Sequence, residues 1–467
     1  MPAVRILKNP DEYFTRLMSA KKYNRLFPLT LTAFERFMQT DDRADYPMTF
    51  VIEMDFEGVL KKTEFEDAVE QTLLRHPLLT SRIEIGKRDL PVWIPQEDLK
   101  PTISYGAESD LIECPEGDQF DNTQEAGVRI YVRQGTEKVR ITFYFDHKCT
   151  DGVGAHIVCG EIMAYYANGV EGKEVAQLPE QNPLLLKTRQ QRQLVYGGIS
   201  LTQRPHWHAW KYAFKVAGFA SQTLASRFKK TDKQLRPRFG VLTDSLDPAE
   251  HKVLREAAVQ HGVTVNDIVI AELFLTLVKW NKSLGKLKRR KFKVLMPSNL
   301  RQRGDDEMPC ANMTTYNFIS RKPKECQDRF SLVKSIRDDT NEIKTKNTGA
   351  DFLEAIAKGF GLSWLIPFVV SSRSTLSSAV ISNVGDPTRR YTCRIPREKG
   401  DVVCGNLKLE QVGGSPPLRP NTRAAWAITT YRRKLSVSVR LDPFLYDQDD
   451  SVKILEMYLN GLREWLK

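Results

Sequence analysis

Alternating and helical patterns of apolar residues recur along both halves of the chain. In the first half, residues 49–58 alternate like a half-buried strand, and residues 61–76 place apolar side chains at helical spacing. In the second half, Asp247 is the expected cap of a helix that begins with Pro248 and ends near Gly262. Because each half mixes strands with helices, the pattern predicts an α/β protein.

The remaining pattern completes this picture. Residues 264–280 are apolar nearly all round and predict a buried helix, and residues 451–466 predict an amphipathic one. Thr30 or Thr32 is the expected cap of a short helix. Further strands are expected at 78–85, 128–132, 139–145, 239–246, 292–297 and 379–385, and a hairpin is expected to join 424–430 to 435–441.

A chain of 467 residues is too long for one ordinary hydrophobic core, so we expect two lobes. We place them at 1–180 and 238–467, with a connecting segment at 181–237. Within the connector, residues 205–219 are aromatic and basic at helical spacing. A packed connector helix is the favoured interpretation, with its lysines reaching solvent. A cover over a hydrophobic tunnel, or a helix lying on a lipid surface, remains open.

The composition, with 41% hydrophobic and 27% charged residues, is typical of a soluble globular protein. The N-terminal residues do not resemble a secretory signal, and no apolar stretch is long enough to span a bilayer. The seven cysteines have no paired spacing, which predicts reduced thiols and no metal site. We therefore expect a cytoplasmic location and no transmembrane segment.

The net charge of +12 suits an acidic or phosphate-bearing partner. Its densest basic run is 286–293, directly before a predicted strand. A solvated loop is the favoured interpretation of this run, and a patch that attracts a phosphorylated donor is the alternative. No nucleic-acid-binding motif accompanies the charge, so we expect no nucleic-acid partner.

The richest chemistry lies where the strand at 139–145 ends. His147 stands there, followed by Asp151 and Gly152 and then by a predicted helix. Imidazole is the side chain best suited to move a proton near neutral pH, and Gly152 permits backbone angles that other residues resist. The motif predicts an active site at the end of a sheet, although a hydrogen-bonded turn histidine and a common Asp-Gly turn would look the same.

Several sequence blocks together resemble the chloramphenicol-acetyltransferase-like superfamily, which includes peptide-synthetase condensation domains and alcohol acyltransferases. The blocks follow the order found in that superfamily and cover most of the chain. They are His76-Pro-Leu-Leu-Thr-Ser-Arg82, the HxxxDG motif from His147 to Gly152, Thr264 to Ala271, Pro297-Ser-Asn-Leu-Arg301, Asn312, and Ser382-Asn-Val-Gly385.

The resemblance implies two similar α/β lobes that form a pseudo-dimer around a central tunnel, with His147 near its middle. His147 and Gly152 would be catalytic, and His147 would be the general base. Asp151 would pair with Arg301 to hold the loop, so Arg301→Ala should be about as harmful as Asp151→Ala.

The resemblance also implies oxyanion or substrate contacts by Ser382 and Asn383. An amide donor aimed at the developing charge and a side chain that only holds the turn are equally compatible with the pattern.

Two departures from the superfamily pattern narrow the assignment. Asp146 stands where lipid-oriented members often carry a second histidine, and no plant-type DFGWG block is present. Both departures argue against a wax ester synthase or a plant-type enzyme. Cys149 lies inside the motif, but a nucleophilic thiol needs a paired base and exposure, so a spacer is the favoured interpretation.

The function implied is transfer of an acyl group from a coenzyme A or carrier-protein thioester to a hydroxyl or amine. No acyl-enzyme and no permanently bound cofactor are expected. A stand-alone condensation enzyme with two carrier-bound substrates, and a catalytically silent binding protein of the same fold, are the alternatives. A small-molecule or lipid acceptor, a monomeric state and some peripheral membrane contact are compatible with this function.

Overall fold

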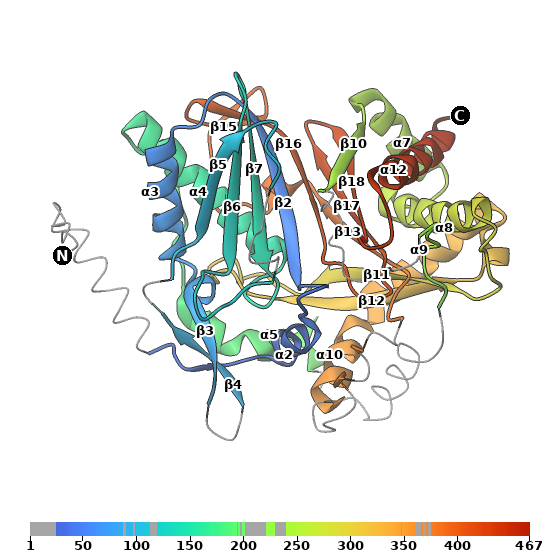
Figure 1. The fold of residues 1–467 in the computed structure, drawn as a ribbon, viewed down its shortest axis with the longest axis horizontal. Helices are drawn as coiled ribbons and strands as arrows, with labels where there is room; N and C mark the ends of the chain where they lie inside the picture. Colours follow the sequence, from blue (N-terminus) through green and yellow to red (C-terminus); the bar gives the residue numbers. More distant parts are fainter. Residues whose placement is uncertain are drawn as a thin grey trace.

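The computed structural model describes most of the chain (Figure 1). The described residues are 25–86, 90–96, 99–112, 119–193, 195–196, 199–200, 221–228, 240–346, 348–359, 366–367, 370–371 and 375–467. The predicted helix at 205–219 lies outside them.

The first lobe is built on a seven-stranded sheet. Its strand order is β14 (Arg397–Glu398), β15 (Asp401–Cys404), β16 (Leu407–Ser415), β2 (Thr49–Glu57), β7 (Lys138–Asp146), β6 (Val128–Gln134) and β5 (Thr102–Ala107). Helices α3 (Lys62–Leu73) and α4 (Gly152–Glu171) pack together beside it (Figure 1). Phe143 and Phe65 belong to the shared core of this sheet and these helices, so apolar burial holds the layer together.

The second lobe is built on a six-stranded sheet. Its order is β10 (Leu242–Leu246), β18 (Lys434–Leu441), β17 (Ala424–Tyr431), β13 (Ala379–Gly385), β11 (Phe292–Asn299) and β12 (Thr314–Arg321). Figure 1 shows the helices of this lobe on the side away from the first lobe. They are α7 (Pro248–Gln260), α8 (Val265–Ser283), α9 (Arg329–Lys346) and α12 (Gln448–Arg463).

Shorter elements lie around the two sheets. A three-stranded sheet has the order β1 (Leu29–Thr30), β4 (Pro91–Pro95) and β3 (Ser81–Ile85), and β8 (Val195–Tyr196) pairs with β9 (Ile199–Ser200). The remaining α-helices described are α2 (Ala33–Asp41), α5 (Arg189–Gln193) and α10 (Thr348–Gly359). Short 3₁₀ helices are η1 (Pro77–Thr80), η3 (Pro183–Thr188), η5 (Pro323–Cys326), η6 (Pro387–Arg389) and η7 (Glu464–Leu466).

One segment of the second half crosses over to the sheet of the first lobe, which the predicted division of the chain did not anticipate. β16 belongs to the second half of the sequence, yet it pairs along its length with β2 of the first lobe, with Ser415 opposite Val51. The segment 397–415 is therefore part of the first lobe's sheet. A single boundary at residue 238 assigns this segment to the second lobe. The sequence could not show otherwise, because the apolar pattern of a strand does not reveal which sheet the strand joins.

Most predicted elements are present with their capping chemistry. Thr32 caps α2 and Thr264 caps α8, each in a reciprocal capping box, and Asp247 caps α7. The hairpin between β17 and β18 turns at Arg432 and Arg433, both with positive φ, as a two-residue hairpin turn of this hand requires.

Two expected strands are shorter than predicted. Residues 77–80 form a 3₁₀ turn before β3, and the strand expected from residue 239 is described only from Leu242. Pro77 fixes its own φ and removes a backbone donor, which favours that turn over a ladder.

Within the described residues, no single helix combines the length and apolarity needed to cross a bilayer. Helices α7 and α8 satisfy the criterion only as a pair, which is bent by 98°.

Candidate active site

His147 lies directly after β7, where the first lobe meets residues of the second. Its backbone N–H donates to the carbonyl of Met48 at 2.8 Å, and its ring lies against Phe50 with 4.9 Å between centroids. The side chain is 8% exposed. These contacts fix the direction of the imidazole before any substrate arrives.

The hydrogen bond of Nδ1 sets the tautomer of His147. Nδ1 lies 3.0 Å from the carbonyl oxygen of Thr150, which can only accept, so Nδ1 carries the hydrogen and Nε2 keeps its lone pair. Asn312 Nδ2 lies 3.2 Å from Nδ1 and 2.7 Å from the His147 carbonyl oxygen. We take the carbonyl as the partner of this amide, because a protonated Nδ1 cannot accept a hydrogen bond.

Burial lowers the pKa of His147, and the negative charge of Asp151 offsets only part of this effect. The ring is therefore neutral at pH 7. Among the described residues, Nε2 has no hydrogen-bond partner, so the structure holds a neutral imidazole with a free acceptor nitrogen.

Asp151 is the carboxylate of the motif, and both of its oxygens accept several hydrogen bonds. Its oxygens accept from Arg301 Nη1 at 2.9 and 2.8 Å, from Met313 N at 2.7 Å, from Gly154 N at 2.8 Å and from Thr314 Oγ1 at 3.1 Å. Burial alone would raise the pKa of Asp151, but Arg301 and the backbone donors lower it below its ordinary value. The expected pair with Arg301 is therefore present, and Asp151 also caps α4.

Asp146, directly before His147, also has a local partner set. It accepts from Asn122 Nδ2 at 2.8 Å and from the backbone N–H of Lys148 at 2.9 Å. Lys148 Nζ lies 3.4 Å from Asp146 and 2.5 Å from Asp42. This buried charge group ties the His147 loop to the end of α2.

Cys149 lies on the interior side of the same loop. Its side chain is fully buried, and burial raises the pKa of its thiol well above the ordinary value. A β-carbon on Gly127 would come within 2.5 Å of its sulfur, so the packing leaves no room for a substrate there. The geometry agrees with the spacer interpretation.

Gly152 corrects one expectation. It is the first residue of α4, its φ lies outside the left-handed region, and a β-carbon placed on it would meet no atom within 4 Å. The turn therefore does not need glycine for its backbone angles. A side chain at this position would instead project into open space at the helix start.

Gly154 is the glycine that the local packing requires. A β-carbon there would come within 2.3 Å of Thr150 Oγ1 and 3.1 Å of Arg301 Nη2. Sequence reasoning missed this position, since the close approach of Arg301 to α4 is visible only in three dimensions.

Ser382 and Asn383 lie within β13, two to three residues before its end at Gly385. Asn383 is exposed, its Nδ2 donates to Asn266 Oδ1 at 2.9 Å, and its Oδ1 accepts from Gly385 N at 3.1 Å. Neither partner belongs to the His147 loop. These contacts favour the interpretation in which the side chain holds the turn.

The second half supplies contacts that the motif itself does not contain. Asn312, Met313 and Thr314 bond to His147 or Asp151 from the start of β12. Only Asn312 had a sequence signal, through its place in the superfamily block. Met313 donates through its backbone N–H and Thr314 through a hydroxyl group, and no sequence pattern distinguishes these two donors from others of the same kind.

A cavity of about 740 Å³ lies between the two lobes. Val51, Thr142 and Tyr144 line it from the first sheet, and Val241 and Arg440 line it from the second lobe. Among the described residues, no group of three or more His, Cys, Asp or Glu side chains could hold a metal ion.

Comparisons with known proteins agree with this architecture. A model of the condensation domain matches residues 36–284, just over half of the chain. No curated protein sequence matches significantly.

Solved structures match over nearly the whole chain. The first condensation domain of the CDA synthetase is 13% identical, with a TM-score of 0.64 over 94% of this chain and 96% of that one. Polyketide synthase associated protein 5 from Mycobacterium tuberculosis is 14% identical, with a TM-score of 0.61 over 94% and 97%. The epimerization domain of tyrocidine synthetase B is 13% identical, with a TM-score of 0.62 over 94% and 97%.

At such identities the structural likeness establishes the fold, which is the chloramphenicol-acetyltransferase-like fold of two lobes. Together with the match of the family model, it shows that the chain belongs to the condensation-domain family, whose members generally transfer acyl or peptidyl groups.

Proposed function

We propose that this protein is an acyltransferase in which His147 is the general base. The observation that carries the proposal is the neutral imidazole whose Nδ1–H donates to the Thr150 carbonyl, which leaves Nε2 as a proton acceptor. A buried, neutral histidine of fixed tautomer is suited to deprotonate an attacking alcohol or amine.

The reaction follows from this arrangement. The acceptor hydroxyl or amine attacks the thioester carbonyl carbon while Nε2 takes its proton. The carbonyl of Thr150 then stabilises the imidazolium through Nδ1–H. As the tetrahedral intermediate collapses and the carbon–sulfur bond breaks, Nε2–H returns the proton to the departing thiolate. No acyl-enzyme is formed.

Gly152 keeps a place in the proposed site. The backbone N–H groups of Gly152 and Val153 lie in the first turn of α4, where N–H groups have no intrahelical partner. Open space in front of Gly152 would let a developing oxyanion approach these donors. Ser382 and Asn383 contribute less directly in this proposal, through the turn that follows β13.

Asp151 and Arg301 support the site and do not react. The carboxylate is saturated by donors from α4 and from the start of β12, so it has no role as a relay to His147. Their pairing joins the loop of His147 to the second lobe.

The donor is proposed to be a coenzyme A or carrier-protein thioester, and the acceptor a hydroxyl or amine of a small molecule or lipid. The protein would need no permanently bound cofactor. We keep the proposed cytoplasmic location, monomeric state and peripheral membrane contact as expectations. A stand-alone condensation enzyme that requires carrier-bound substrates remains the main alternative, and a silent binding protein is the other.

A thiol-release assay tests the proposal. Purified protein is mixed with acyl-CoAs of several lengths, or with the same acyl groups on a carrier protein, and with panels of alcohols and amines. Release that requires the carrier protein would favour the condensation enzyme. Release from neither donor class, in a protein shown to be folded, would favour the silent fold.

A further inference from the structure

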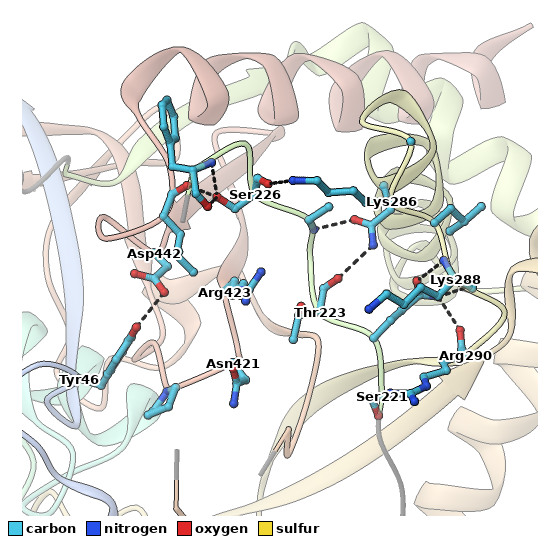
Figure 2. A pocket seen from close by; sticks show the side chains of 18 residues that line it. Tyr46, Ser221, Thr223, Ser226, Lys286, Lys288, Arg290, Asn421, Arg423 and Asp442 are labelled. Carbon is cyan, nitrogen blue, oxygen red and sulfur yellow. Dashed lines mark hydrogen bonds between the residues drawn. The ribbon is translucent and has the colours of Figure 1, made fainter. Parts of the chain in front are cut away.

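A second cavity, of about 830 Å³, is lined by none of the residues that contact His147. Figure 2 shows the side chains that line it. Three segments enclose it: residues 221–228, the turn between α8 and β11, and the chain around Asn421 and Asp442. Its volume lies in the range of small-molecule sites, about 300–1,000 Å³. A concave space of this size suits a small ligand better than a macromolecular surface.

The basic run of the sequence forms one wall of this cavity, and Gln222 holds that wall in place. Its Nε2 donates to the carbonyl of Lys288 at 3.1 Å, its Oε1 accepts from the N–H of Lys288 at 3.1 Å, and its N–H donates to the carbonyl of Lys291 at 3.0 Å. Gln222 is 5% exposed. The backbone of the basic turn is therefore anchored, which a freely solvated loop would not require.

The cavity carries an excess of positive charge. Among the described residues that line it, the basic side chains are Lys286, Lys288, Arg290 and Arg423, and the acidic one is Asp442. Asp442 accepts from Tyr46 Oη at 2.9 Å and from Phe444 N at 3.0 Å, so its charge is partly satisfied by neutral donors. Lys286 Nζ donates to the carbonyl of Ser226 at 2.6 Å, and the residue is exposed at this wall.

Two buried donors at this cavity lack a protein partner. Ser221 is 6% exposed, and its Oγ has no hydrogen-bond partner in the described part of the chain. The Nε of Arg423 is likewise buried and unpaired there, although Arg423 Nη1 donates to the Leu224 carbonyl at 2.9 Å. Unsatisfied buried donors are costly, and a ligand with acceptor oxygens would relieve that cost.

We propose that this cavity binds the phosphate groups of a small molecule. Phosphate oxygens only accept hydrogen bonds in their charged form, and guanidinium and ammonium groups are their common protein partners. Arg423 and Ser221 would hold one phosphate at the buried end, and Arg290 with Lys288 would hold another near the entrance. The source is a free nucleotide or the nucleotide part of coenzyme A. The inference does not depend on the acyltransferase proposal.

Calorimetric titration with inorganic pyrophosphate, adenosine 3′,5′-bisphosphate and coenzyme A tests the proposal on the full chain. Saturable binding is expected, and the double variant Lys288→Gln/Arg290→Gln should weaken it by about tenfold or more. Both side chains are exposed, so these changes should leave the fold intact. Ser221→Ala should weaken binding by a smaller factor, since it removes one uncharged donor.

Arg289→Gln is the matched control, because Arg289 belongs to the same basic run but does not line the cavity. Its affinity for pyrophosphate should stay within about twofold of the wild-type value. Equal weakening by Arg289→Gln and Arg290→Gln would overturn the proposal, because it would show that the positive charge of the whole basic run attracts the anion without a specific site. The absence of saturable binding would overturn it too. His147→Ala should bind pyrophosphate like the wild type, which separates this test from the catalytic one. Competition between coenzyme A and pyrophosphate identifies coenzyme A as a source, whereas tight binding of the bisphosphate alone identifies a nucleotide.

Discussion

Arg301 Nη1 donates to both carboxylate oxygens of Asp151, at 2.9 and 2.8 Å, across 150 residues of sequence. The pair joins the start of α4 in the first lobe to the second residue after β11 in the second lobe. Asp151 is fully buried and Arg301 nearly so. The orientation of His147, four residues before Asp151, therefore depends on contacts between the lobes.

The two members of this pair should differ in their cost on removal. Asp151→Ala leaves Arg301 without its carboxylate and uncaps α4, so we expect a loss of about 3–5 kcal/mol of unfolding free energy. Arg301→Ala should cost about half as much, because Met313, Gly154 and Thr314 still donate to the carboxylate. Urea unfolding of the two variants measures the difference. Equal losses of unfolding free energy would contradict this difference and would support the expectation from the sequence that the two substitutions are about equally harmful.

The rate of transfer should fall in acid. Burial lowers the pKa of His147 below 6.5, so the neutral base is the main form at pH 7 and is lost as the pH falls through the lowered pKa. We expect kcat/KM to be flat from pH 7 to 8 and to decline with an inflection below 6.5. A profile of thiol release with a chemically fast-reacting acyl donor measures it. An acid limb centred above 6.5 would contradict a buried neutral histidine.

Gly152→Ala separates catalysis from stability. The added methyl meets no protein atom within 4 Å and the backbone is not left-handed, so stability should rise by up to about 1 kcal/mol. Activity should fall by about tenfold or more, since the methyl group would occupy the space before the proposed oxyanion donors. Thermal unfolding and thiol release are measured on the same preparation. An active, stabilised variant would remove Gly152 from the catalytic site.

Cys149 should be dispensable for chemistry. Its thiol is buried and its pKa is raised, so it is neither ionised nor accessible at pH 8. We expect Cys149→Ala to keep its kcat within about threefold of the wild-type value, with a small loss of stability from the cavity. A loss comparable to that of His147→Ala, together with a trapped acyl-enzyme in mass spectra, would support covalent catalysis instead.

Local sequence signals anticipated much of the fold. The caps Thr32 and Asp247 and the hairpin around Arg432 follow from short-range chemistry, so the sequence pattern could find them. The order of motif blocks anticipated the pair of Asp151 with Arg301.

Long-range relationships were not accessible in the same way. The insertion of β16 beside β2 depends on which sheet edge is free, and a strand's pattern does not encode that edge. The Thr150 carbonyl and the Met313 N–H act through the backbone, which every residue possesses. A side chain at Gly154 would meet both Thr150 and Arg301, and Arg301 comes from the other lobe, so the sequence around Gly154 does not reveal this packing.

The most direct test of the account is the rate of thiol release by His147→Ala against wild type, with an active donor and acceptor pair. Loss of the general base should lower kcat/KM by about 10²–10⁴-fold while unfolding stability changes little. His261→Ala is the matched control, because His261 lies at the end of α7 in the second lobe. It should react at the wild-type rate. Unchanged turnover in folded His147→Ala protein would contradict the assignment of His147 as the base.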